Sequence, residues 1–254
     1  MDVGDPRTRH FPIVTGGPEV VLAIVASYLL FVKKIGPTLM KNRPAFELRG
    51  PMLVYNSFMV VFNMYFFYEI VRRSDYGRRF LNFKFPERND YSDEVLHEIH
   101  VGFWCFLTRF LDLFDTIFFV LRKKYSQITF LHLYHHTLVP LIGWVCLKIA
   151  PQAPVIGLFL TFNTMIHSIM YLYYALAAFG PQVRQYLWWK KYITQLQLLQ
   201  FATCFCYGVV MAFLQTGFPP GLFWFGFAQN PIFFYQFYQF YRKAYKTNQK
   251  LKHN

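Results

Sequence analysis

Charge is scarce in this chain of 254 residues. Asp, Glu, Lys and Arg make up 15% of it, whereas soluble domains average about 25%. Cysteine is scarce too, and all four cysteines lie within apolar segments, which argues against a disulfide framework. No N-x-Ser/Thr glycosylation sequon occurs. The first 17 residues are polar or turn-like, so we expect no cleavable signal peptide and a signal anchor in the first apolar run.

Apolar residues dominate instead: 55% of the chain is hydrophobic and 21% is aromatic, with 31 Phe and 18 Tyr. They gather in seven runs of roughly 15–25 residues, the length that a helix needs to cross a bilayer. The sequence therefore predicts an all-α polytopic membrane protein with seven transmembrane helices. Neither a linker nor a repeat divides it, so residues 1–254 are predicted to form a single transmembrane domain. The predicted spans are 18–35, 51–71, 101–121, 130–148, 154–178, 192–214 and 221–241.

Lys and Arg give the chain a net charge of +13. They flank the apolar runs and do not form one face or arm, so we expect lipid headgroups or phosphorylated molecules as partners, and no nucleic acid. Most of them fall in loops on the same side of the membrane as the C-terminus. This predicts a short luminal N-terminus and a cytosolic tail at about 242–254. Residues 250–254 fit a K-x-K-x-x retrieval signal, which favours the endoplasmic reticulum membrane.

Polar residues recur inside four of the spans at helical spacing, so each set shares one helix face. In lipid, such faces turn toward a bundle interior or a cavity. Hydrogen bonding between helices would explain an Asn or a Gln, but it explains poorly an Arg, two Asp and four His. The four sets are Arg109, Asp112 and Asp115; His132, His135 and His136; Asn163, His167, Tyr171 and Tyr174; and Thr194, Gln197 and Gln200.

The histidine cluster begins just after a basic loop that the charge count places in the cytosol. We therefore expect a substrate to enter from the cytosolic side. Arg122, Lys123 and Lys124 lie at that entrance, and Lys190 and Lys191 lie at the mouth of another cytosolic segment. Basic residues there suit phosphate groups, although the ordinary interpretation of any single one is a positive-inside flank.

Three kinds of chemistry are open to this cluster. Membrane di-iron oxygenases and desaturases carry several H-x-x-H-H boxes, but here His10 and His253 lie in the termini, and His97 and His100 lie at the opposite edge. A single zinc ion remains compatible with the spacing. A neutral imidazole can also attack a thioester and carry the acyl group, without any metal. Nothing marks a cysteine as a thiolate nucleophile.

Several strings are similar to the ELO-type very-long-chain fatty acid elongases, the membrane 3-ketoacyl-CoA synthases. The resemblance covers nearly the whole chain in order, with Arg109 and Asp112 where the family usually has Lys and Glu. The matching strings are Asp5–Arg7, Gly36-Pro37 with Met40, Asn42-Arg43 and Phe46, Asp115–Lys124, His132–His136, Asn163–Tyr174, Tyr186–Thr194 and Gln197–Phe201.

The resemblance implies that an acyl-CoA condenses with malonyl-CoA to a 3-oxoacyl-CoA two carbons longer, with release of CO2 and CoA. It implies six helices around a substrate tunnel closed at the luminal end, and no bound cofactor or metal. The implied partners are membrane lipid, the reductase and dehydratase enzymes of the elongation cycle, and a second subunit in a homo- or hetero-oligomer.

The resemblance also suggests a role for each polar residue. His135 is expected to be the nucleophile, with His136 as the alternative, and His167 to stabilise the oxyanion or assist decarboxylation. His132 would orient the site, and the carboxylates of Asp112 and Asp115 would fix imidazole tautomers. The expected substrate-binding residues are Arg109, Lys123, Lys124, Asn163, Tyr171, Tyr174, Lys190, Lys191, Thr194, Gln197 and Gln200.

Two functions without catalysis share some of these features. A seven-helix receptor has the same span count and orientation, but it leaves the intramembrane histidines unexplained, and no luminal cysteine pair is present. A transporter would be expected to repeat its halves, which this sequence does not do.

Overall fold

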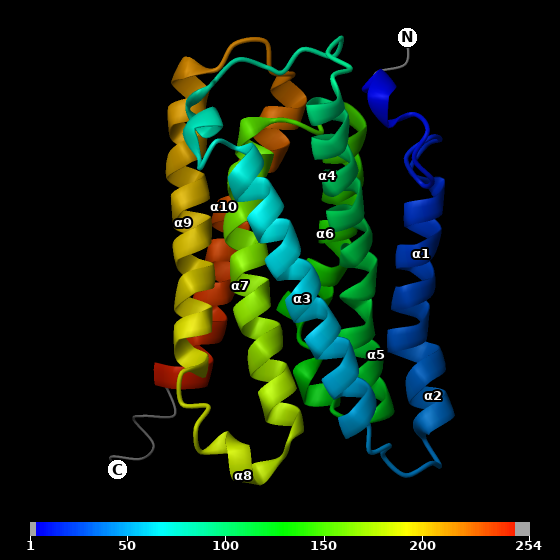
Figure 1. Ribbon diagram of the computed structural model, residues 1–254. Helices are drawn as coiled ribbons and strands as arrows, with labels where there is room; N and C mark the ends of the chain where they lie inside the picture. The colour runs from blue at the N-terminus through cyan, green and yellow to red at the C-terminus, as the bar shows by residue number, and fades with distance from the viewer. Residues whose placement is uncertain (1–3, 247–254) are drawn as a thin grey trace. The chain divides into compact units, whose positions relative to one another are not determined.

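The computed structural model describes residues 4–246, and helices dominate this part of the chain (Figure 1). The retrieval signal predicted at 250–254 lies outside it. Apart from an isolated bridge between Lys84 and Thr216, the described residues contain no strand pairing. The α-helices are α1 (Glu19–Leu30), α2 (Gly36–Met40), α3 (Arg49–Arg73), α4 (Asp93–Leu111), α5 (Leu113–Leu121), α6 (Phe130–Ile149), α7 (Pro154–Ala178), α8 (Pro181–Arg184), α9 (Lys190–Leu214) and α10 (Pro220–Tyr241).

All seven predicted spans fall on helices, and in two cases the helical segment extends more than two residues beyond the predicted bounds. A π-helical turn at Phe31–Ile35 joins α1 to α2, so the first helical segment reaches Met40. The third begins at Asp93, because a polar helical stretch precedes the apolar run, and it turns at Asp112 into α5.

Four of the helical segments in the described residues are long and apolar enough to cross a membrane: Glu19–Met40, Phe130–Ile149, Pro154–Ala178 and Lys190–Leu214. Large apolar side chains are exposed on several helices, for example Val61 at 64% and Phe213 at 83%. Apolar surface of this kind suits lipid contact. The architecture is that of a multi-pass membrane protein.

The chain forms two compact units. The first unit contains the chain up to Arg49 together with Pro86–Gln152, and the second contains Gly50–Phe85 together with the chain from Ala153.

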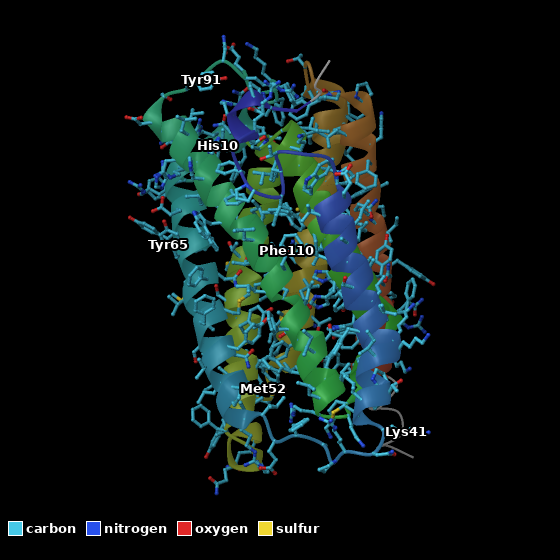
Figure 2. The ribbon with its side chains drawn as sticks, turned by 90° about the vertical axis from the view of Figure 1, so that its right-hand side faces the viewer. His10, Lys41, Met52, Tyr65, Tyr91 and Phe110 are labelled. Carbon is cyan, nitrogen blue, oxygen red and sulfur yellow. The ribbon has the colours of Figure 1, made fainter. Side chains whose placement is uncertain are left out.

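Within the first unit, α6 packs against both α1 and α4 (Figure 1). His10 and Tyr91 lie at one end of this unit and Lys41 at the opposite end (Figure 2). We call the first the N-terminal end (residues 4–18, 86–92 and 150–152) and the second the box end (residues 41–48 and 122–129). Within this unit, α1–α2 and α4–α5 run from the N-terminal end to the box end, and α6 runs back.

Hydrogen bonds to buried charge hold the N-terminal end together. Asp5 accepts from Arg7 at 2.7 Å, and both side chains are 1% exposed. Arg7 also donates to the Asp90 carbonyl at 3.1 Å and to Gln152 Oε1 at 2.8 Å. Gln152 in turn donates to Glu98 Oε2 at 2.9 Å. This network joins the N-terminal segment, α4 and the end of α6.

α6 contributes two further donors to the same end. Lys148 Nζ lies 2.9, 3.3 and 3.0 Å from three successive carbonyl oxygens, those of residues 14–16. The Trp144 indole donates to the Ile13 carbonyl at 2.9 Å. The N-terminal segment is therefore fastened to α6 through its backbone.

Apolar packing holds the box end. Tyr28, Val32, Met40, Leu113 and Val120 form one buried cluster. A Cβ built at Gly36 would lie 2.6 Å from Val120 Cγ1, so glycine permits a close approach of α2 to α5.

In the second unit, α9 packs against α7 and α10. The ring of Phe201 stacks on that of Phe233, with centroids 5.5 Å apart, and lies tilted against that of Phe237 at 5.3 Å. The Tyr207 hydroxyl donates to the Phe80 carbonyl at 2.6 Å, which ties the 74–85 connection to α9.

Prolines lie inside two of these helices, Pro140 in α6 and Pro231 in α10. Both helices continue through them. Because proline has no N–H, Pro140 cannot donate to the carbonyl of His136 four residues earlier.

Candidate active site

The residues singled out in the sequence fall into two groups, one in each unit. The first unit contains Arg109, Asp112, Asp115, Lys123, Lys124, His132, His135 and His136, and the second contains Asn163, His167, Tyr171, Tyr174, Lys190, Lys191, Thr194, Gln197 and Gln200.

The box histidines occupy the first two turns of α6. Thr129 caps the helix, since its hydroxyl accepts from the His132 backbone N–H at 3.3 Å. The ring of His136 lies 4.2 Å from that of His132 and 5.2 Å from that of His135, between centroids. His136 is buried and the other two are half-buried. The structure thus places the rings of His132 and His135 against that of His136.

Two hydroxyl groups continue this cluster. Nε2 of His132 lies 2.6 Å from Thr116 Oγ1, and Thr116 Oγ1 lies 2.8 Å from the phenol oxygen of Tyr28. Thr116 is fully buried and Tyr28 is buried. Neither residue is predicted from the sequence as part of the site, because a lone hydroxyl in an apolar run shows no periodic pattern. The only signal for Thr116 is its place next to Asp115 in the D-T-I-F-F string.

A buried ion pair lies at the junction of α4 and α5. Arg109 Nη1 and Asp112 Oδ2 are 3.1 Å apart, and both side chains are buried. Arg109 also donates to Thr108 Oγ1 at 2.9 Å. The two residues that depart from the usual Lys and Glu thus still meet, even though aspartate is one methylene shorter. Asp115 lies half-buried on α5.

Lys123 and Lys124 follow α5 at the box end. The N–H of Lys124 donates to the Phe119 carbonyl at 2.8 Å, and Lys123 has a positive φ of 55°. This is the Schellman end of a helix, in which glycine usually occupies the left-handed position. The Lys123 ammonium is 3.5 Å from the Lys41 carbonyl, and Lys124 is exposed.

In the second unit, α7 presents the predicted polar ridge. His167 and Tyr171 are buried, with ring centroids 5.9 Å apart, and Tyr174 lies 6.1 Å beyond Tyr171. The Tyr55 hydroxyl on α3 is 3.4 Å from that of Tyr171. Asn163 lies half-buried one turn before His167.

On α9, Thr194 and Gln200 are buried and Gln197 is half-buried. Within the described part of the chain, Nε2 of Gln200 is buried without a hydrogen-bond partner. Such a donor is costly to leave unpaired, so it points to a polar group of a ligand.

Lys190 and Lys191 are exposed at the start of α9. Their ammonium groups lie 5.8 Å and 4.9 Å from the rings of Tyr173 and Tyr192. Both positions leave the charge accessible to an anion.

α3 carries a further polar face that the sequence analysis missed. Asn56 and Asn63 are buried two turns apart, and Asn63 donates to the Met59 carbonyl at 2.8 Å. Glu69, also buried, accepts from Arg73 at 2.9 Å. The seven-residue spacing of the two asparagines was the available signal.

No group of three or more His, Cys, Asp or Glu side chains is placed to hold a metal ion among the residues that the structure describes. Three imidazoles in one group, with a hydroxyl on one of them, are side chains that can act as a nucleophile, a proton donor or a proton acceptor.

Known proteins resemble this chain over most of its length. A family model described as "ELO: GNS1/SUR4 family" matches residues 13–253. A very long chain fatty acid elongase of Aedes aegypti is 37% identical over 251 residues, which cover 97% of this chain and 68% of that protein. Human very long chain fatty acid elongase 1 is 42% identical over 208 residues, or 79% and 71% of the two chains. Rat very long chain fatty acid elongase 7 is 38% identical over 252 residues, or 97% and 88%.

Proposed function

Because the chain belongs to the ELO (GNS1/SUR4) family, we propose that it elongates fatty acids as a very-long-chain 3-oxoacyl-CoA synthase. Its substrates would be a long-chain acyl-CoA and malonyl-CoA, and it would need no bound cofactor or metal. The observation that carries this proposal is the group of three touching imidazoles in the first turns of an apolar helix. Imidazole is costly in such a place, so three together there support a functional site.

The proposed reaction has two stages. The unprotonated nitrogen of His135 attacks the acyl thioester, a C–N bond forms, the C–S bond breaks, and CoA leaves with the proton of the ring. Malonyl-CoA then loses CO2, and the resulting enolate attacks the acyl carbonyl. A C–C bond forms, the C–N bond breaks, and the imidazole recovers a proton from solvent. His136 is the alternative nucleophile.

The remaining residues have supporting roles in this proposal. His167 would stabilise the oxyanion or assist decarboxylation, and His132 would orient the site. Gln200, with its unpaired buried donor, is suited to a substrate carbonyl. Lysines are suited to the phosphates of CoA. The proposed substrate-binding residues are Arg109, Lys123, Lys124, Asn163, Tyr171, Tyr174, Lys190, Lys191, Thr194, Gln197 and Gln200.

The setting is also proposed. Seven helices would cross the endoplasmic reticulum membrane, with the N-terminus in the lumen and the C-terminus in the cytosol. Six of them would surround a tunnel closed at the luminal end. The partners would be the reductase and dehydratase of the elongation cycle, together with a homo- or hetero-oligomeric subunit.

The first experiment tests whether the protein catalyses the condensation. Purified protein is incubated with C16–C24 acyl-CoAs and labelled malonyl-CoA, and the products are analysed by mass spectrometry. We expect malonyl-CoA-dependent addition of two carbons. Product that requires oxygen and bound iron would overturn the proposal in favour of an oxygenase.

The second experiment tests whether a histidine carries the acyl group covalently. Intact-mass measurement after incubation with acyl-CoA alone should show one acyl adduct, and peptide mapping should place it on His135. The adduct should be lost in His135→Ala, whereas retention there and loss in His136→Ala would exchange the two roles. Condensation by a wild-type protein that never forms an adduct would exclude the acyl-imidazole.

A further inference from the structure

A chain of three side chains from three helical segments ends on the box. Tyr28 of α1, Thr116 of α5 and His132 of α6 are linked at 2.8 and 2.6 Å. Thr116 is 0% exposed and Tyr28 is 6% exposed. Water therefore does not compete for these hydroxyl groups, and each must satisfy its hydrogen bonds from the others.

The acidity of the three side chains and the distances between them indicate which group donates in each hydrogen bond. A phenol is a stronger acid than an alcohol, and an imidazole nitrogen is a stronger base than either. The order Tyr28 to Thr116 to His132 thus sends each proton toward the better acceptor. A distance of 2.6 Å also fits an O–H donor, since N–H donors lie at about 2.9–3.0 Å from oxygen.

This order fixes the state of the histidine. If Nε2 of His132 accepts from Thr116, the neutral ring carries its proton on Nδ1. Its other nitrogen can then only donate to the rest of the site. With its Nε2 lone pair engaged, His132 is also removed from the candidates for the nucleophile, which leaves His135 and His136.

We propose that Tyr28 and Thr116 are positioning residues that hold His132 as the Nδ1–H tautomer for acyl transfer. Thr116 acts directly on the ring. Tyr28 acts through Thr116, because its hydroxyl occupies the acceptor side of the threonine and turns the threonine proton toward the histidine. The first helix thereby takes part in setting the geometry of the site. This inference rests on the proposed function.

Kinetics of four variants test it: Thr116→Val, Thr116→Ser, Tyr28→Phe and the double variant Tyr28→Phe/Thr116→Val. Valine keeps the shape of threonine without its hydroxyl. We expect Thr116→Val to lower kcat about tenfold, the effect of one hydrogen bond, with KM for both substrates unchanged. Thr116→Ser should restore the rate. Tyr28→Phe should lower kcat by a smaller factor, and it should add nothing in the double variant.

Three outcomes would overturn the inference. Thr116→Val with wild-type kcat would show that the bond has no effect on the reaction. Thr116→Ser as slow as Thr116→Val would show that the methyl group matters and not the hydroxyl. If Tyr28→Phe lowers kcat by the same factor in the Thr116→Val background as it does alone, Tyr28 acts independently of Thr116.

Chemical labelling gives a readout that does not need the reaction. Diethyl pyrocarbonate acylates unprotonated imidazole nitrogens, and mass spectrometry resolves each histidine. We expect His132 to be labelled several-fold faster in Thr116→Val than in wild type, with exposed His97 as the internal reference. Equal labelling would contradict the proposed bond. A wild-type protein without malonyl-CoA-dependent activity but with this labelling difference would overturn the proposed function alone.

Discussion

The two ends of the first unit are held together by different means. At the N-terminal end, Arg7 and Lys148 donate to carboxylate, amide and carbonyl oxygens of separate segments. At the box end, packing at Gly36 and Val120 brings α2 against α5, and lysines lie at the surface. Charged side chains stabilise the fold at the N-terminal end, whereas at the box end they remain accessible at the surface. Stability and substrate binding should therefore respond to substitutions at different ends.

The largest effect is expected for Arg7→Met. Removing one partner of a buried pair leaves Asp5 as an uncompensated buried charge, which costs about 3–5 kcal/mol. Thermal unfolding in detergent should show a markedly lower Tm. Arg43→Met, an exposed arginine in the loop of the box end, is the control and should change stability by less than about 0.5 kcal/mol. Equal Tm values for the two variants would contradict the comparison.

Lys148→Met tests the fastening of the N-terminal segment to α6. The variant keeps the apolar stem but loses the donors to three carbonyls, so we expect a loss of about 1.5–3 kcal/mol. Limited proteolysis should then cleave the segment near residues 14–16 faster than in wild type. An unchanged cleavage rate would mean that the apolar contacts of Phe11 and Val14 suffice to hold the segment.

Gly36→Ala tests the packing of the box end. The added Cβ would collide with Val120, so we expect destabilisation of about 1–3 kcal/mol. Val120→Ala, introduced together with it, should recover part of that stability by making room. If the double variant loses more unfolding free energy than the two single variants lose together, the close approach is not the reason for glycine at this position.

Lys123→Gly is expected to have the smallest effect on stability and the opposite sign. Glycine adopts the left-handed conformation at little cost, so the variant should gain about 0.5–1 kcal/mol. If the ammonium binds a phosphate of CoA, KM for acyl-CoA should nevertheless rise several-fold. Lys123→Asn, which also tolerates this conformation, should show the same rise in KM. An unchanged KM in both variants would leave Lys123 as an ordinary flank.

Hydropathy was sufficient to predict where the long helices lie, because the apolar runs are long even though polar residues recur inside them. It could not predict their ends. The first predicted span ended at residue 35, whereas the helical segment continues because proline is tolerated in the first turn of α2. The polar start of α4 at Asp93 carries no apolar signal.

Periodicity likewise found the polar faces but not the contacts between helices. His132 and His136 are four residues apart, so their proximity follows from the helix itself. The bonds from Tyr28 to Thr116 and on to His132 join residues far apart in the sequence, and they depend on how three segments pack. The same holds for Arg7 with Asp90 and Gln152. A single sequence contains no signal for such pairs.

Pro140 marks the point where α6 can bend between its two halves. The half after it is held by Trp144 and Lys148, and the half before it bears the histidines. A helical turn that lacks one backbone hydrogen bond bends more easily than the others. A bend at Pro140 would therefore change the orientation of the imidazoles without releasing Trp144 and Lys148 from the N-terminal segment.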